Sequence, residues 1–176
     1  MKVILIAVTS LDGKITKGDN PNVHDWSSAE DRKYFSTLIK KSELVIMGRK
    51  TFQTARADMK LSPETRRVVL TGKPALYRKF EIPKQLEFTS ESPQTLMKRL
   101  GKYHRTALLV GGSEINSAFL RASLIDEIWL TVEPLILGIG KTLFSKDTLG
   151  QRMKLLHLKR LNRNGTLLLK YKIERR

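Results

Sequence analysis

The sequence contains no cysteine, which excludes disulfide bonds and cysteine metal sites. It also lacks any apolar run approaching the roughly 18 residues that a membrane-spanning helix needs. The apolar stretch at the start is too short for the core of a signal peptide. The three histidines, His24, His104 and His157, have no spacing typical of metal ligands. We therefore expect a cytoplasmic protein with no metal and no membrane partner.

Acidic residues are scarce: 33 Lys and Arg stand against 17 Asp and Glu, so the net charge is +16. The densest basic part is 152–176, with nine Lys or Arg and one Glu. Such a charge can bind nucleic acid or attract anionic small molecules. Aromatic residues that stack on bases are not interleaved with the basic ones. A solvated basic surface is the favoured interpretation, and nucleic-acid binding is a less favoured alternative.

Strand-like and helix-like segments alternate along the chain, whose 176 residues suit one domain. Apolar segments typical of strands fall at 2–9, 43–48, 67–71, 86–89, 106–112, 125–133, 153–161 and 166–174. Helices are expected from Ser27 or Ser28 to about Lys41, from Arg49, from Pro93 to about Lys102, and from 113 to about Ala122. Asn164-Gly165 predicts a hairpin between the last two strands. The pattern indicates one α/β domain over 1–176, with three layers, a mostly parallel central sheet and an antiparallel C-terminal hairpin.

One carboxylate lies in line with an apolar helix face. Asp31, Phe35 and Leu38 are spaced i, i+4, i+7, so they share one face of the first helix. Asp31 is either an ordinary first-turn acid helped by the helix dipole or a buried functional acid, and the residues alone favour the first. Trp26, just before this helix, is more typical of a core residue or a lid anchor than of a catalytic group.

Four expected strand ends carry glycine or hydroxyl residues at the edge where open α/β sheets bind ligands. They are Ala7–Thr9, Gly48–Thr51, Thr71–Gly72 and Gly111–Ser113. Two of them, at Gly48 and at Gly111-Gly112, lead directly into helix N-termini, which favour phosphate. Two such sites suit a dinucleotide, and the positive charge of Arg49 and Lys50 suits the 2′-phosphate of NADPH. The residues alone leave plain tight turns equally open.

Two common nucleotide motifs are excluded. G-x-G-x-x-G is absent. Gly140-Lys141-Thr142 resembles the end of a P-loop, but Leu135 stands where the first glycine belongs and no helix pattern follows.

The order and spacing of these segments resemble the dihydrofolate reductase superfamily over nearly the whole chain. The matching pieces are Ile6-Ala7, Trp26 five residues before Asp31, Phe35, VIMGRKTF at 45–52, VVLT at 68–71, VGG at 110–112 and Leu130-Thr131. The resemblance implies that Asp31 anchors a pterin ring and promotes its protonation, with a pKa raised by a semi-buried site. It implies a catalytic set of Asp31, Thr131 and Trp26, in which Thr131 supports Asp31.

The same resemblance implies the binding residues. Those for the substrate are Ile6, Ala7, Asp31, Phe35, Val110 and Arg66. Folate reductases place an arginine that binds the folate glutamate where this sequence has Thr65, so the adjacent Arg66 is the candidate for that role. Those for NADPH are Ala7, Gly13, Ile15, Gly48, Arg49, Lys50, Thr51, Leu70, Thr71, Gly72, Val110, Gly111, Gly112, Ser113, Glu114 and Ile115.

Two branches of the superfamily supply hypotheses for the reaction. The leading one is NADPH-dependent reduction of 7,8-dihydrofolate to tetrahydrofolate, because Trp26, Asp31, Phe35 and Thr131 resemble a pterin site. The alternative is the riboflavin-pathway reductase that acts on 5-amino-6-(5-phosphoribosylamino)uracil, which the chain resembles at SLDGKI (10–15) and across 114–140. Either implies a small-molecule partner, a pterin or a pyrimidine, and a monomer or homodimer.

Overall fold

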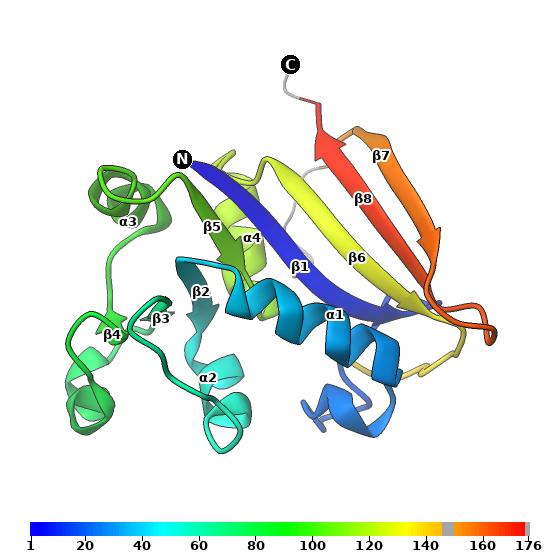
Figure 1. The fold of residues 1–176 in the computed structure, drawn as a ribbon, viewed down its shortest axis with the longest axis horizontal. Coiled ribbons are helices and arrows are strands. Elements are labelled where there is room, and N and C mark those ends of the chain that lie inside the picture. Colours follow the sequence, from blue (N-terminus) through cyan, green and yellow to red (C-terminus); the bar gives the residue numbers. More distant parts are fainter. Residues whose placement is uncertain (146–149, 175–176) are drawn as a thin grey trace.

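The computed structural model describes residues 1–145 and 150–174 and contains an eight-stranded sheet (Figure 1). The strands are β1 (Lys2–Ser10), β2 (Leu44–Gly48), β3 (Arg66–Leu70), β4 (Leu86–Thr89), β5 (Thr106–Leu109), β6 (Glu127–Glu133), β7 (Met153–Arg160) and β8 (Leu167–Ile173). Their spatial order is β4-β3-β2-β5-β1-β6-β8-β7. The helices are α1 (Ala29–Lys40), α2 (Arg49–Ala55), α3 (Pro93–Leu100) and α4 (Ser113–Arg121), with 3-10 turns η1 (Val23–Asp25) and η2 (Pro74–Phe80).

The sheet has the predicted mixture of directions. All pairings among β1 to β6 are parallel, and β8 pairs antiparallel with both β6 and β7. Gly165, in the turn between β7 and β8, has φ +98°, a conformation that suits glycine. The predicted α/β architecture with a C-terminal hairpin is therefore confirmed.

Helices cover both faces of the sheet, and β1 shows why its apolar sequence does not alternate. Val3 and Leu5 pack in a core with Leu96 of α3 and Phe119 of α4. Ile4 and Ile6 pack in a second core on the opposite face, with Phe52 of α2. Figure 1 shows α1 and α4 on opposite sides of the central strands. A strand buried on both faces has no polar side to present.

The helix starts follow their capping residues. Ser28, the second of the two candidates, is the N-cap of α1, and its hydroxyl accepts a hydrogen bond from the Asp31 amide. Ser92 caps α3 in the same way, with Pro93 in the first turn. The 3-10 turn η2 was not expected. Its Phe80 makes an edge-on ring contact with Phe52 of α2, and the ring centroids lie 5.9 Å apart.

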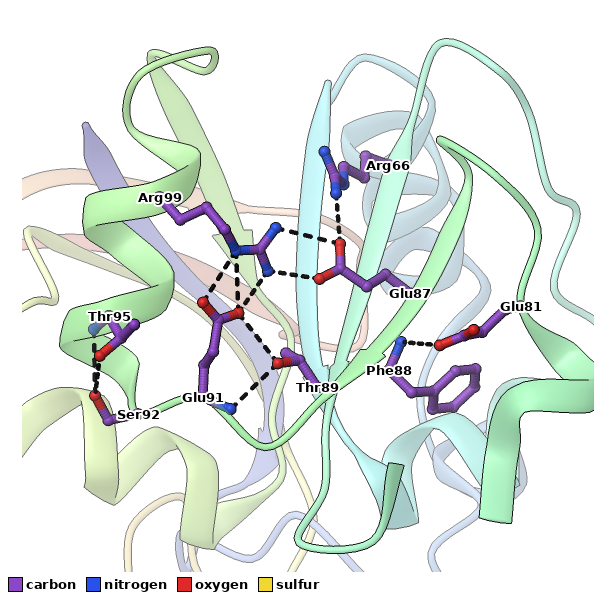
Figure 2. A network of polar contacts seen from close by, with 9 residues as sticks. All are labelled: Arg66, Glu81, Glu87, Phe88, Thr89, Glu91, Ser92, Thr95 and Arg99. Carbon is purple, nitrogen blue, oxygen red and sulfur yellow. Dashed lines mark hydrogen bonds and ion pairs between the residues drawn. The ribbon is translucent and has the colours of Figure 1, made fainter. Parts of the chain in front are cut away.

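An ion-pair network ties β3 and β4 to α3, as Figure 2 shows. Arg66 of β3 pairs with Glu87 of β4 at 2.5 Å, and Arg99 of α3 pairs with Glu87 and Glu91, each at 2.5 Å. Thr89 adds a hydrogen bond to the Glu91 carboxylate. The network fixes the outer parallel strand against the helix that follows it.

The basic C-terminal segment forms the hairpin at the other side of the sheet. Every residue of β7 is exposed to solvent. Arg175 and Arg176, part of the basic segment at 152–176, lie outside the described residues. Within 1–145 and 150–174, no helix has the length and apolar character required to cross a membrane.

Candidate active site

The central strands part at their carboxyl ends, and this is where several predicted site residues lie. The pairing of β1 with β5 ends at Leu5 and Leu109. The pairing of β1 with β6 continues to Ser10 and Glu133. Ile6 and Ala7 therefore lie just beyond the last β1–β5 pair, and Val110 follows β5 at the same edge. A crevice at the carboxyl ends of parallel strands is the usual ligand site of open α/β sheets.

Asp31 lies on the first turn of α1 and is buried, with 6% of its surface exposed. The hydroxyl of Thr131, on β6, donates a hydrogen bond to its carboxylate. Phe35, one turn further along α1, is 39% exposed. The structure thus brings the predicted pair Asp31 and Thr131 together and places a large aromatic ring on the same helix face, accessible to solvent.

The environment of Asp31 raises its pKa from the ordinary value to about 6. Burial is the main cause, because it disfavours the charged form, and the negative charge of Glu133 acts in the same direction. The Thr131 hydrogen bond and the charges of Arg32 and His24 oppose the increase. An acid with this pKa exchanges its proton near neutral pH, as a general acid must.

Glu133 is a buried acid next to this group that the sequence analysis did not single out. It is 3% exposed and ends β6, two residues after Thr131 on the same strand face. One carboxylate oxygen accepts the Ser28 amide at 2.8 Å, and the other accepts the Thr166 hydroxyl at 2.6 Å. The alternation of Thr131 and Glu133 in a strand was the available signal, but it does not reveal which helix faces them.

Three buried polar atoms near the start of α1 have no hydrogen-bond partner among the described residues. They are Nε1 of Trp26, Oγ of Ser27 and the hydroxyl of Tyr34. Burial and the nearby charge of Asp31 raise the pKa of Tyr34 to about 12, so the group remains an O–H donor. Unpartnered donors at a buried position can be satisfied by a polar ligand.

The predicted phosphate site combines β2, β5 and α4. The Gly48 amide, at the end of β2, donates to the Gly111 carbonyl at 2.7 Å. A Cβ on Gly48 would lie 2.7 Å from Cγ1 of Ile115, so only glycine lets α4 begin this close to β2. Gly112, the N-cap of α4, provides no side-chain cap, which leaves the first-turn amides without one. This cradle fits a phosphate group of a dinucleotide.

The remaining side chains predicted for this site have defined places. Thr51 of α2 adjoins Gly112, because its Oγ1 lies 3.6 Å from where a Gly112 Cβ would be. Arg49 donates to Gln53 at 2.8 Å, and Lys50 is exposed. Thr71 follows Leu70 of β3, and its hydroxyl accepts the Lys73 amide at 3.3 Å. Four further members of the predicted set are placed as follows: Gly72 is exposed, Ser113 donates to the Thr142 carbonyl, Glu114 is exposed, and Ile115 packs on the core.

Gly13 and Ile15 belong to a loop that is joined to the segment after β6. The Ile15 amide donates to the Lys141 carbonyl at 2.8 Å, and Asp12 accepts the amides of Leu137 and Gly138. These bonds, with one from the Ser10 hydroxyl as the largest effect, lower the pKa of Asp12 to about 2. Asp12 is therefore a loop-fixing acid, and the Gly140 region is not a P-loop.

Arg66 is not brought to Asp31. Its guanidinium pairs with Glu87 on the α3 side of the sheet, because side chains alternate along β3. The adjacent Arg67 lies on the other face and is buried. Its guanidinium donates to the carbonyls of Lys60 and Thr65, at 2.8 and 3.2 Å. The structure therefore gives both arginines protein partners, and neither lies among the groups around Asp31.

Other features of the described surface do not overlap with this site. No group of His, Cys, Asp and Glu in 1–145 or 150–174 is arranged to hold a metal ion. Two hollows lie away from the site, at the amino-terminal ends of the parallel strands. Met1, Lys2, Asp126, Glu127 and Lys172 line the first, and Lys41, Ser42, Glu43, Tyr103, Arg105 and Thr106 line the second.

A sequence profile of the RibD C-terminal domain matches residues 1–167. The chain belongs to the RibD C-terminal domain family. This family is part of the dihydrofolate reductase-like superfamily, so the resemblance seen in the sequence is confirmed at that level. Two Bacillus subtilis (strain 168) relatives are the uncharacterized proteins YwjB, 28% identical over 88% of each chain, and YyaP, 27% identical over 81% of this chain and 80% of YyaP.

Solved structures of other RibD-like proteins share the fold. A putative riboflavin biosynthesis protein from Shewanella sp. PV-4 is 21% identical, with a TM-score of 0.80 over 99% of this chain and 100% of its own. The Thermotoga maritima deaminase/5-amino-6-(5-phosphoribosylamino)uracil reductase is 20% identical, with a TM-score of 0.76 over 98% of this chain. This RibD-type domain spans 56% of that larger protein.

Proposed function

We propose that this chain is an NADPH-dependent reductase of a ribosylaminopyrimidine, of the type of 5-amino-6-(5-phosphoribosylamino)uracil. The observation that carries the proposal is the buried Asp31, hydrogen-bonded to Thr131 at the carboxyl edge of a RibD-type sheet. Membership of the RibD C-terminal domain family favours this substrate over dihydrofolate, which led the sequence-based hypotheses. Arg66, the residue expected to bind the glutamate of folate, forms an ion pair with Glu87 instead, which also argues against dihydrofolate.

The residues present fit NADPH at the β2–α4 cradle. Gly112 begins α4 without a side chain, Gly48 and Gly111 hold that turn against β2 through a backbone hydrogen bond, and the positive charge of Arg49 and Lys50 lies nearby on α2. When bound, NADPH supplies the hydride. The backbone of Ala7 and Val110, where β1 and β5 part, would hold the nicotinamide near the substrate.

A ribosylamine presents a C=N bond only after its sugar ring opens: the C1′–O4′ bond breaks, O4′ gains the proton of the amine nitrogen, and a C1′=N bond forms. Asp31 would deliver the proton that accompanies hydride transfer to this C=N bond. The hydride adds to carbon, and the nitrogen then requires a proton. A carboxyl group with a pKa of about 6 carries that proton in part of the molecules at neutral pH. Thr131 holds the carboxyl in place, and Phe35 offers an apolar surface for the flat ring of the substrate.

The test is NADPH oxidation by the purified protein, followed by the loss of its near-ultraviolet absorbance. The phosphorylated ribosylaminopyrimidine, its dephosphorylated form and dihydrofolate are compared side by side. We expect oxidation with the first, slowed by about 100-fold or more in the Asp31→Asn variant. The exposed Asp58→Asn serves as the matched control and should retain activity. Turnover of dihydrofolate alone would refute the proposed substrate class.

A further inference from the structure

Glu133 is buried, with no cationic partner in the part of the chain that the structure describes. Its two oxygens accept hydrogen bonds from the Ser28 amide and the Thr166 hydroxyl. Among residues 1–145 and 150–174, no Lys, Arg or His forms an ion pair with it. Both oxygens of this acidic side chain thus accept hydrogen bonds from uncharged donors. Burying the charge of such a group lowers stability, so its position calls for a role other than strengthening the fold.

The contacts of Glu133 converge on the turn that carries Asp31. Ser28, whose amide Glu133 accepts, is also the N-cap whose hydroxyl accepts the Asp31 amide at 3.2 Å. On the other side, Asn162 of the β7–β8 turn donates to Thr166 at 2.9 Å and to Glu30 at 3.1 Å. The first turn of α1 is thus fixed both to the end of β6 and to the hairpin.

The charge of Glu133 also acts on Asp31 directly. Thr131 and Glu133 face α1 from the same side of β6, and Thr131 donates to the Asp31 carboxylate. The other charged groups around Asp31 are Arg32 on α1 and His24 on η1, and both favour the ionised form of Asp31. The neutral Tyr34 faces it as well. Glu133 therefore acts on Asp31 in the direction opposite to Arg32 and His24.

We propose that Glu133 is a positioning residue of the reductase site, which fixes the first turn of α1 against the end of β6 and places a negative charge beside the carboxyl group of Asp31. The use of the Asp31 proton rests on the proposed function, whereas the control of Asp31 by Glu133 does not. A residue that only anchored the helix would act through its hydrogen bonds, and its charge would be irrelevant to Asp31.

Two nearly isosteric variants separate the charge from the hydrogen bond. Glu133→Gln removes the charge, whereas Thr166→Val removes one hydrogen bond to Glu133 and keeps the charge. The readout is the pKa of Asp31, followed by NMR through its carboxyl ¹³C shift and assigned by its disappearance in Asp31→Asn. We expect Glu133→Gln to lower this pKa by about one pH unit and Thr166→Val to leave it at the wild-type value.

An unchanged Asp31 pKa in Glu133→Gln would overturn the proposal. If that variant does not fold, the double variant Glu133→Met/Thr166→Val is used instead. It removes the charge of Glu133 together with the Thr166 hydroxyl, which would otherwise lose its hydrogen-bond acceptor. We expect the same decrease in the pKa of Asp31. The pH profile of NADPH oxidation should shift in the same direction. A lowered pKa in a protein that reduces none of the three test compounds would support the role of Glu133 and refute the proposed reaction.

Discussion

The hydroxyl of Thr131 donates its hydrogen bond to Asp31 from a strand, while Asp31 belongs to the first turn of a helix. This hydrogen bond stabilises the ionised form of Asp31, because a hydroxyl donor interacts more strongly with a carboxylate than with a carboxylic acid. Thr131 therefore opposes the effect of burial and of Glu133.

Replacing Thr131 with valine should raise the pKa of Asp31 further. Valine has nearly the same shape but cannot donate a hydrogen bond to the carboxylate. We expect the pH profile of NADPH oxidation to shift to higher pH, opposite to the shift expected for Glu133→Gln. Profiles measured on the two variants under the same conditions check this. Shifts in the same direction would contradict the assigned contacts.

Replacing Asp31 with asparagine should stabilise the protein at neutral pH. The folded-state pKa is about 6, against about 3.9 for an unfolded Asp. The folded form therefore binds the proton more tightly, and the contribution of Asp31 to stability falls as pH rises from about 4 to about 6. Asparagine avoids this loss, which is worth about 2–3 kcal/mol above pH 6.

Urea unfolding of the wild type and of Asp31→Asn, at pH 4 and pH 7.5, measures this difference. The gain in the free energy of unfolding should appear at pH 7.5. It should nearly vanish at pH 4, where Asp31 in the folded wild type is protonated and therefore as neutral as the asparagine of the variant. At the same time the variant should lose activity by about 100-fold or more, the usual contribution of a general acid. A variant that is destabilised at pH 7.5 would show that the Asp31 charge is well solvated.

Adding a methyl group at Gly48 should disturb the phosphate cradle. A Cβ there would lie 2.7 Å from Ile115 Cγ1, so the Ile115 side chain or the start of α4 must shift. We expect a loss of about 1–3 kcal/mol of stability and weaker NADPH binding, measured by thermal unfolding and by calorimetric titration. Gly48→Ala/Ile115→Ala removes the clashing atom and should recover part of the stability. If NADPH affinity is unaffected in Gly48→Ala, the cofactor lies elsewhere.

Gly140 holds the loop after β1 by a backbone contact that has no room for a side chain. A Cβ on Gly140 would lie 2.0 Å from the carbonyl oxygen of Thr16. Gly140→Ala should therefore separate the two segments and speed hydrogen exchange of the Ile15 amide, which bonds to Lys141. Gly150→Ala, where no atom of residues 1–145 or 150–174 lies within 4 Å of the new Cβ, is the control and should leave this exchange unchanged.

The sequence predicted the fold where local pattern and packing agree. The apolar run of β1, the glycine that ends β2 and the Asn164-Gly165 turn each determine one element, and each is present. The turn η2 was missed because PALYRKF has neither a strand nor a helix period and is held by ring contacts with α2.

The sequence predicted the site only where the spacing of residues along one element places them on the same face. The helix spacing of Asp31 and Phe35 placed them on one face, but the burial of Asp31 depends on β6, far along the chain. The partner of Arg66 could not be foreseen, because it depends on the register of β3 with β4, in which Val68 lies opposite Glu87. Glu133 was missed for the same reason: its contacts are made only when α1, β6 and β8 meet.

The place of β1 in the sheet has a consequence for protein synthesis. This strand is made well before its two neighbours in the sheet, β5 and β6, which leave the ribosome only after residue 106. Until then the nascent chain carries a strand that is apolar on both faces and has two unpaired edges, the arrangement most prone to intermolecular pairing. Pairing of β1 within the sheet can therefore begin only when β5 or β6 has been made, and a chain that stops earlier leaves both edges of β1 unpaired.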